Sequence, residues 1–255
     1  MMHALSTLNA KIESGLTPLG IFVTSQDPAS TTILGDVGFD FVLLDCEHGP
    51  IDKVIALHHV RAAQAVGTLV LARVLENSPA LIQSFLDIGV EGIVVPHIDD
   101  ADAARRMVNA TRYGPGGRGM CPICHAARYS LETWSHHIRQ SNANILAIPL
   151  LESQAAVENI AEIAAVDGIE FVKFGPGDLS QDMGLDLSRD LPKLMDAWHH
   201  VRDTVKAAGK KTMVPGGFGF QGADVVVRDM DLMLLRQRAI DIVAEHRAST
   251  GKTGH

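Results

Sequence analysis

The chain has 255 residues, of which 46% are hydrophobic and 20% charged, and these values are typical of one large globular domain or of two smaller lobes. Its formal net charge of -8 and its pI near 5.8 argue against a nucleic-acid partner and an anionic membrane surface, because both need a basic protein face. The first residues lack the pattern of a signal peptide and no stretch approaches a membrane span, so we expect a cytoplasmic protein with no membrane partner.

Short apolar runs alternate with helical stretches along the chain, after a leading helix at residues 5–15. Strands are predicted at residues 18–24, 38–45, 68–74, 92–97, 145–153, 169–180, 211–215 and 223–227, the sixth running into a glycine-containing turn. Helices are predicted from residue 27 and at residues 51–67, 78–89, 102–113, around 134–138, 155–165, 191–208 and 232–248. This alternation predicts an α/β fold of the (β/α)8 TIM-barrel type, forming a single domain over residues 1–255.

The seventh unit is the exception to this pattern. Only residues 216–222 separate its strand from the next one, which is too few for a crossover helix. Either that helix is reduced to a turn or the eighth strand is misplaced. An open doubly wound sheet is the alternative architecture, because its strands also alternate with helices, but no GxGxxG motif follows the first strand to indicate a dinucleotide site.

Ionisable residues follow several predicted strands at their carboxyl ends, which share one rim in a barrel. The residues concerned are Asp45, Glu47, His48, Arg73, Glu152 and Asp178. Two carboxylates suit a hard divalent cation with open positions, a histidine suits a base near neutral pH, and an arginine suits a developing oxyanion. Taken singly, each residue is more simply explained as a helix cap, a surface ion pair or a satisfied polar group.

Four segments together carry a resemblance to a known family. They are GFDFVLLDCEH at residues 38–48, LDIG at 86–89, GRG at 117–119 and FGPGDLS at 174–180. In this order and spacing the chain resembles the HpcH/HpaI family of metal-dependent class II pyruvate aldolases, such as 4-hydroxy-2-oxoheptanedioate aldolase and the 2-keto-3-deoxy sugar-acid aldolases. The resemblance implies a homo-oligomer, expected to be a hexamer, with sites near subunit interfaces and a C-terminal helix at about residues 232–248 that packs on a neighbouring subunit.

The resemblance also implies how a substrate is held. Glu152 and Asp178 match the ligands of a divalent metal ion, which would be Mg, Mn or Co. The backbone amides of Gly177 and Asp178 match a cradle for the pyruvate carboxylate. Arg73 matches the arginine that stabilises the enolate.

A second group of roles concerns proton transfer and support. By resemblance, His48 matches the catalytic histidine and Asp87 matches the acid that fixes its tautomer. Arg118, in the Gly-rich loop, is a candidate contact for a substrate anion, with a structural hydrogen-bonding role as the alternative. Asp45 and Glu47 flank the histidine, so we expect them to support it rather than to react.

The reaction implied by the resemblance cleaves or forms 4-hydroxy-2-oxo acids through a pyruvate enolate, with pyruvate and an aldehyde as the small-molecule partners. One alternative is a related enolate lyase, either an oxaloacetate decarboxylase or an acyl-CoA lyase of the citrate lyase β type. Another is a barrel that has lost catalysis and binds a 2-oxo acid, because fold does not guarantee function.

The chain departs from the family pattern at three positions. Leu150 stands where the family often has glutamine, Lys173 replaces an apolar residue in the sixth strand, and Asp229 stands where glycine is common. A lysine in a barrel strand raises a rival mechanism, in which it forms a Schiff base with the 2-oxo acid. Strand alternation puts Lys173 on one face with Phe171, but the sequence does not say whether that face points inward.

Cys121, Cys124 and His125 match the short pattern of covalent haem attachment. That attachment requires export and a haem-wrapping domain, and a zinc site would need a second pair of ligands. We therefore interpret the two cysteines as incidental thiols in a loop.

Overall fold

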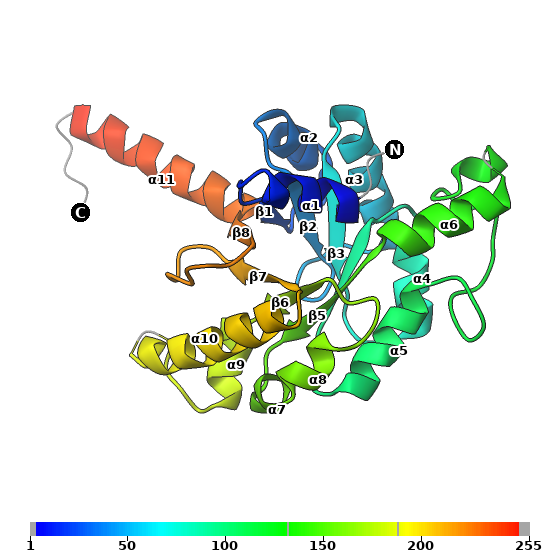
Figure 1. Ribbon diagram of the computed structural model, residues 1–255. Helices are drawn as coiled ribbons and strands as arrows, with labels where there is room; N and C mark the ends of the chain where they lie inside the picture. Colours follow the sequence, from blue (N-terminus) through cyan, green and yellow to red (C-terminus); the bar gives the residue numbers. More distant parts are fainter. Residues whose placement is uncertain (1–3, 132, 188, 250–255) are drawn as a thin grey trace.

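The computed structural model describes residues 4–249, apart from residues 132 and 188. Its eight strands are all parallel and follow one another in chain order around a closed barrel, in which β1 pairs with β8 (Figure 1). The strands are β1 Leu19–Val23, β2 Phe41–Asp45, β3 Leu69–Arg73, β4 Gly92–Val95, β5 Leu146–Leu151, β6 Phe171–Phe174, β7 Lys211–Pro215 and β8 Val225–Met230. The closure confirms the predicted TIM barrel and rules out the open sheet.

Helices surround the barrel and carry the predicted connections (Figure 1). They are α1 Ala4–Glu13, α2 Ala29–Asp36, α3 Lys53–Val66, α4 Pro79–Asp87, α5 Ala101–Thr111, α6 Trp134–Asn144, α7 Gln154–Glu158, α8 Ile160–Ala164, α9 Pro176–Asp182, α10 Leu191–Ala207 and α11 Asp231–Ser249, with a 3-10 turn at Arg128–Ser130. Residues 216–224, all of them described, form turns and bends without a helix, so the shortened seventh unit is confirmed. The helix predicted at 155–165 is divided at Asn159, and the turn predicted after the sixth strand is the helix α9.

The barrel interior is filled and is not a pore. One buried cluster consists of inward side chains of the strands, including Phe41, Leu43, Leu71 and Phe171, and a second, larger cluster lies between the strands and the helices. The helix α1 adds Ala4 and Leu8 to the inner cluster and thereby closes the amino-terminal end of the barrel (Figure 1). We therefore expect the site at the carboxyl end, where TIM barrels keep their chemistry.

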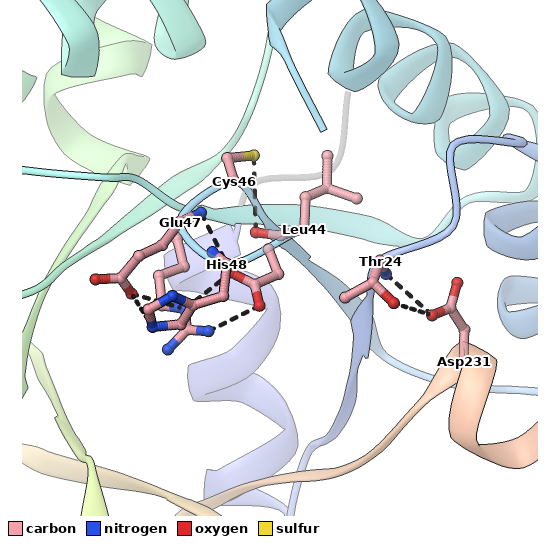
Figure 2. A network of polar contacts seen from close by, with 8 residues as sticks. Thr24, Leu44, Cys46, Glu47, His48 and Asp231 are labelled. Atoms are coloured by element: carbon pink, nitrogen blue, oxygen red, sulfur yellow. Dashed lines mark hydrogen bonds and ion pairs between the residues drawn. The ribbon is translucent and has the colours of Figure 1, made fainter. Parts of the chain in front are cut away.

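The last helix, α11, extends away from the barrel (Figure 1). Its start is fixed by buried Asp231, whose carboxylate accepts hydrogen bonds from the Thr24 amide and hydroxyl (Figure 2). The same carboxylate also accepts from the Ser25 amide. The helix exposes large apolar side chains: Leu232, Met233, Leu234, Leu235, Ile240, Ile242 and Val243. Neither α11 nor any other helix in the described ranges is long and apolar enough to cross a membrane.

Candidate active site

Arg73 and Asp45 form the centre of the barrel mouth. They are the last residues of β3 and β2 and lie opposite each other in the parallel register. The guanidinium donates through Nε to Oδ1 of Asp45 at 3.1 Å and through Nη2 to Oδ2 at 2.7 Å. Asp45 Oδ1 also accepts from the amides of Glu47 and His48, at 3.2 and 3.1 Å. One buried carboxylate therefore fixes both the arginine and the loop that carries the histidine.

The ionisation of Asp45 follows from these contacts. Burial raises the pKa of its carboxyl. The hydrogen bond and charge of Arg73, together with the two backbone amides, lower the pKa by more than burial raises it, so that it lies below its usual value. Asp45 is therefore an anion at neutral pH, and Arg73 is held in a fixed direction.

Glu47 approaches both the arginine and the histidine, and Figure 2 shows its side chain beside that of His48. Its Oε2 is 3.2 Å from Arg73 Nε and 3.7 Å from His48 Nε2. The same oxygen is buried and, among the described residues, accepts no hydrogen bond of good geometry. Burial raises the pKa of Glu47, while the charges of Arg73 and His48 act in the opposite direction. The His48 side chain is 64% exposed, so its ring is open to a ligand at the mouth.

Glu152 follows β5 directly and is 4% exposed. Its Oε1 accepts a hydrogen bond from the His97 amide at 2.9 Å and lies 3.2 Å from His97 Nδ1. Burial raises the pKa of Glu152, His97 lowers it, and the negative charges of Glu47 and Asp178 raise it again. The charges of Glu47 and Asp178 thus reach Glu152, as expected for carboxylates that follow three strands of one barrel and lie at the same rim.

Gly177 and Asp178 lie in the first turn of α9, directly after β6, and both are exposed. A divalent cation is consistent with the donor chemistry here, because the buried Glu152 carboxylate and exposed Asp178 offer oxygen ligands and would gain from a positive charge between them. Within residues 4–249, except 132 and 188, no group of three or more His, Cys, Asp or Glu side chains has the arrangement of a closed metal site. Glu152 and Asp178 therefore suit an ion that keeps several water or substrate oxygens among its ligands.

Asp87 and Arg118 are not part of this mouth within one chain. Asp87 is the last residue of α4, which runs back from the carboxyl end of β3 towards the start of β4, so it lies at the opposite end of the barrel. Its Oδ1 accepts from Arg118 Nη2 at 2.6 Å, and the buried guanidinium lies 4.2 Å from the Tyr113 ring centroid. Among the described residues of one chain, Asp87 does not meet His48, so the predicted pairing does not form within the chain. Arg118 makes the structural contacts given as the alternative, and its contact with a substrate anion stays a prediction.

Two further residues lie at the mouth: His97, which was not among the predicted site residues, and Lys173, whose direction the sequence leaves open. His97, which binds Glu152, ends the predicted fourth strand and carries a positive φ of 54°, so the rule that selected the other strand-end residues would have selected it too. Lys173 was noted, but its direction was open. It belongs to the inward face of β6 with Phe171, and its ammonium is 5.3 Å from the centroid of the Phe22 ring.

A closed parallel (β/α)8 barrel that collects a fixed arginine, an exposed histidine and four carboxylates at its carboxyl-terminal mouth has the architecture of a TIM-barrel enzyme. Residues 18–215 match the model of the family described as HpcH/HpaI aldolase/citrate lyase. The chain belongs to this family, and its membership makes it a carbon-carbon lyase of the aldolase class.

Named relatives agree with this membership. The chain is 38% identical over 168 residues to the 2-dehydro-3,6-dideoxy-6-sulfogluconate aldolase of Pseudomonas putida, a match that covers 66% of this chain and 65% of that relative. It is 33% identical over 192 residues to the 5-keto-4-deoxy-D-glucarate aldolase of Klebsiella pneumoniae, covering 75% of each. A crystal structure of an HpcH/HpaI aldolase from Desulfitobacterium hafniense DCB-2 is similar with a TM-score of 0.87 and 26% identity, over 96% of this chain and 97% of that one.

Proposed function

We propose that this protein is a divalent-metal-dependent aldolase that cleaves or forms 4-hydroxy-2-oxo acids and releases pyruvate and an aldehyde. The observation that carries the proposal is the fixed guanidinium of Arg73, held by Asp45 at the mouth that also contains Glu152 and Asp178. Such a group stabilises the negative charge that develops on an enolate oxygen without having to reorganise. The relatives' substrates, 2-oxo acids with a deoxy carbon next to the carbonyl, suggest the same substrate class here.

Glu152 and Asp178 would hold the metal ion, Mg, Mn or Co. When bound, such an ion withdraws charge from the carbonyl of a 2-oxo acid and makes its neighbouring C-H more acidic. The remaining chemistry belongs to the chain's own residues. The amides of Gly177 and Asp178 at the start of α9 would receive the carboxylate of the 2-oxo acid.

His48 is the group that moves the proton on the aldol oxygen. Its exposed ring reaches into the mouth, and Glu47, 3.7 Å from its Nε2, limits its orientation. During cleavage the histidine takes the proton of the 4-hydroxyl, the C3-C4 bond breaks to give the aldehyde, and the electron pair remains on the enolate beside Arg73. Protonation of the enolate carbon then gives pyruvate.

A homo-oligomer, with a hexamer expected, would complete this site. Asp87 lies at the far end of its own barrel from His48, so it can support a histidine only in a neighbouring copy. The apolar residues exposed along α11 supply a surface that a neighbouring copy would cover.

The experiment that tests the proposal is a pyruvate-release assay over a panel of 4-hydroxy-2-oxo acids. We expect release to vanish with EDTA and to return with Mg or Mn, and an aldehyde to appear in equal amount. Release of carbon dioxide from oxaloacetate alone would instead indicate the decarboxylase, and turnover of a CoA thioester alone would indicate the acyl-CoA lyase. Binding of pyruvate without turnover of any panel member would indicate the non-catalytic barrel.

A further inference from the structure

Lys173 is a buried cation that the reaction described above does not use. It lies on β6 in register with Leu150 of β5 and Met213 of β7, and both neighbours belong to the apolar filling of the barrel. The residue is 4% exposed. Glu152 follows Leu150 by two residues and therefore lies one layer nearer to the mouth. Lys173 thus lies in the floor beneath the carboxylates.

The positive charge of Lys173 is uncommitted, unlike that of Arg73. Arg73 donates to Asp45 through Nε and Nη2, and its Nε is also approached by Glu47. Lys173 forms no ion pair with any residue that the structure describes, and its ammonium lies against the ring of Phe22, as the guanidinium of Arg73 does at 5.2 Å. In an interior of low dielectric the field of such a charge extends over several ångströms and is little screened by salt.

Formal charges give this lysine a consequence for the whole mouth. Asp45, Glu47, Glu152 and Asp178 contribute four negative charges, and Arg73 contributes one positive charge. With Lys173 the sum becomes -2, which a single divalent cation cancels. An apolar residue at this position would leave the sum at -3 and would repel an anionic substrate more strongly.

The position of Lys173 also relates to another departure of this chain. The family resemblance places a glutamine at the position of Leu150, and Leu150 is the register partner of Lys173. The polar group expected on β5 is therefore absent, and a polar group is present directly beside it on β6. The two positions are register partners across one strand pair, so the ammonium-bearing side chain of Lys173 lies beside the apolar side chain of Leu150.

We propose that Lys173 is a positioning residue that attracts the carboxylate of the 2-oxo acid to the mouth and adds a second positive charge beside Arg73 for the enolate oxygen. The inference rests on the proposed function for its substrate class. Lys173 then contributes to the recognition of anionic 2-oxo acids from the barrel floor, beneath the metal ligands and His48.

The test compares Lys173→Met with wild type and with Lys211→Met by calorimetric titration. Methionine keeps the length of the side chain and suits apolar surroundings, so the variant should fold. Lys211 is the matched control, because its ammonium also lies over an aromatic ring, Phe171 at 5.6 Å, but at the amino end of β7. We expect Lys173→Met to weaken pyruvate binding to the Mn-loaded protein by about tenfold and to tighten Mn binding without pyruvate. Lys211→Met should change neither.

A pH series separates the charge from a purely structural role. Burial and the positive charge of Arg73 lower the pKa of Lys173 to about 8, while Glu152 and Asp45 act in the opposite direction. The positive charge of Lys173 is therefore present below that pH and is lost above it. We expect pyruvate binding to weaken between pH 7 and 9 in wild type and in Lys211→Met, and to stay flat in Lys173→Met. The double variant Leu150→Gln/Lys173→Met restores a polar group without a charge and should remain weak.

Three results would overturn the inference while leaving the aldolase proposal intact. They are unchanged pyruvate affinity and pH profile in Lys173→Met, full recovery in the double variant, and a pyruvate mass adduct on Lys173 after borohydride reduction. The last result would show imine formation in place of charge attraction. A wild-type protein that releases no pyruvate from any 4-hydroxy-2-oxo acid would instead remove the proposed function itself.

Discussion

Asp45 shows how a single residue organises the mouth. Its two oxygens hold the guanidinium of Arg73, and one of them also fixes the amides of Glu47 and His48. The strand-end rule placed Asp45, Arg73 and Glu152 correctly, because the carboxyl end of every barrel strand faces the same rim. It had no means of placing Asp87 or Arg118, which lie on a helix and a loop and meet each other at the opposite end of the barrel.

We expect Asp45→Asn to lower the free energy of unfolding by about 2–4 kcal/mol, because it removes the charged partner that binds two nitrogens of the largely buried Arg73 and leaves only the approach of Glu47. The depressed pKa of Asp45 makes this contribution present above the ordinary value of 3.8 and lost as the pH falls through the lower pKa of the folded protein. Urea unfolding at pH 7 measures the effect. Asp102→Asn is the control, since its pair with Arg105 is exposed on both sides and should not contribute measurably. Equal stability of the two variants would contradict this account.

Whole elements were predictable where periodicity and end signals agreed. All eight strands and the long helices follow from the alternation of apolar runs with helical stretches, and Asp52, Ser78 and Asp100 cap their helices as such residues usually do. The helix α9 was read as a turn, because Pro176 and Gly177 are turn residues as well as residues of a first helical turn. The direction of Lys173 needed the barrel, since alternation alone does not say which face is inside.

Within the strand β8, the backbone at Asp229 has a conformation that favours glycine. Its φ of 61° lies in the left-handed region, where the family pattern commonly has glycine. We expect Asp229→Gly to raise the free energy of unfolding by roughly 0.5 kcal/mol and Asp229→Ala to lower it by roughly 1 kcal/mol. Chemical denaturation of both variants measures this order. If the glycine variant were less stable than the alanine variant, the left-handed backbone at this position would not be strained.

At the scale of the whole molecule, the barrel buries its apolar surface on itself, whereas α11 does not. The helix starts at a buried carboxylate and then extends away from the barrel (Figure 1). Along its length it exposes large apolar side chains. A surface of this kind is typical of a contact between subunits. A neighbouring copy would also bring Asp87 within range of a histidine that its own chain cannot reach.

We expect light scattering to give a mass that is a multiple of 27.4 kDa for wild type and a smaller multiple for Leu235→Asp, because the new charge would be buried in the contact. Gln237→Glu adds a charge to a different face of the same helix and should leave the mass unchanged. An oligomer that tolerates Leu235→Asp would show that α11 does not form the contact.

The central claim is that a fixed arginine and a metal held by two carboxylates turn this barrel into a pyruvate-forming aldolase. Pyruvate release from a 4-hydroxy-2-oxo acid tests it most directly, measured for wild type and for Arg73→Ala with and without EDTA. The account predicts release by wild type that needs Mg or Mn and that falls by at least about a hundredfold in Arg73→Ala. Release that persists in EDTA, or that Arg73→Ala leaves unchanged, would contradict it.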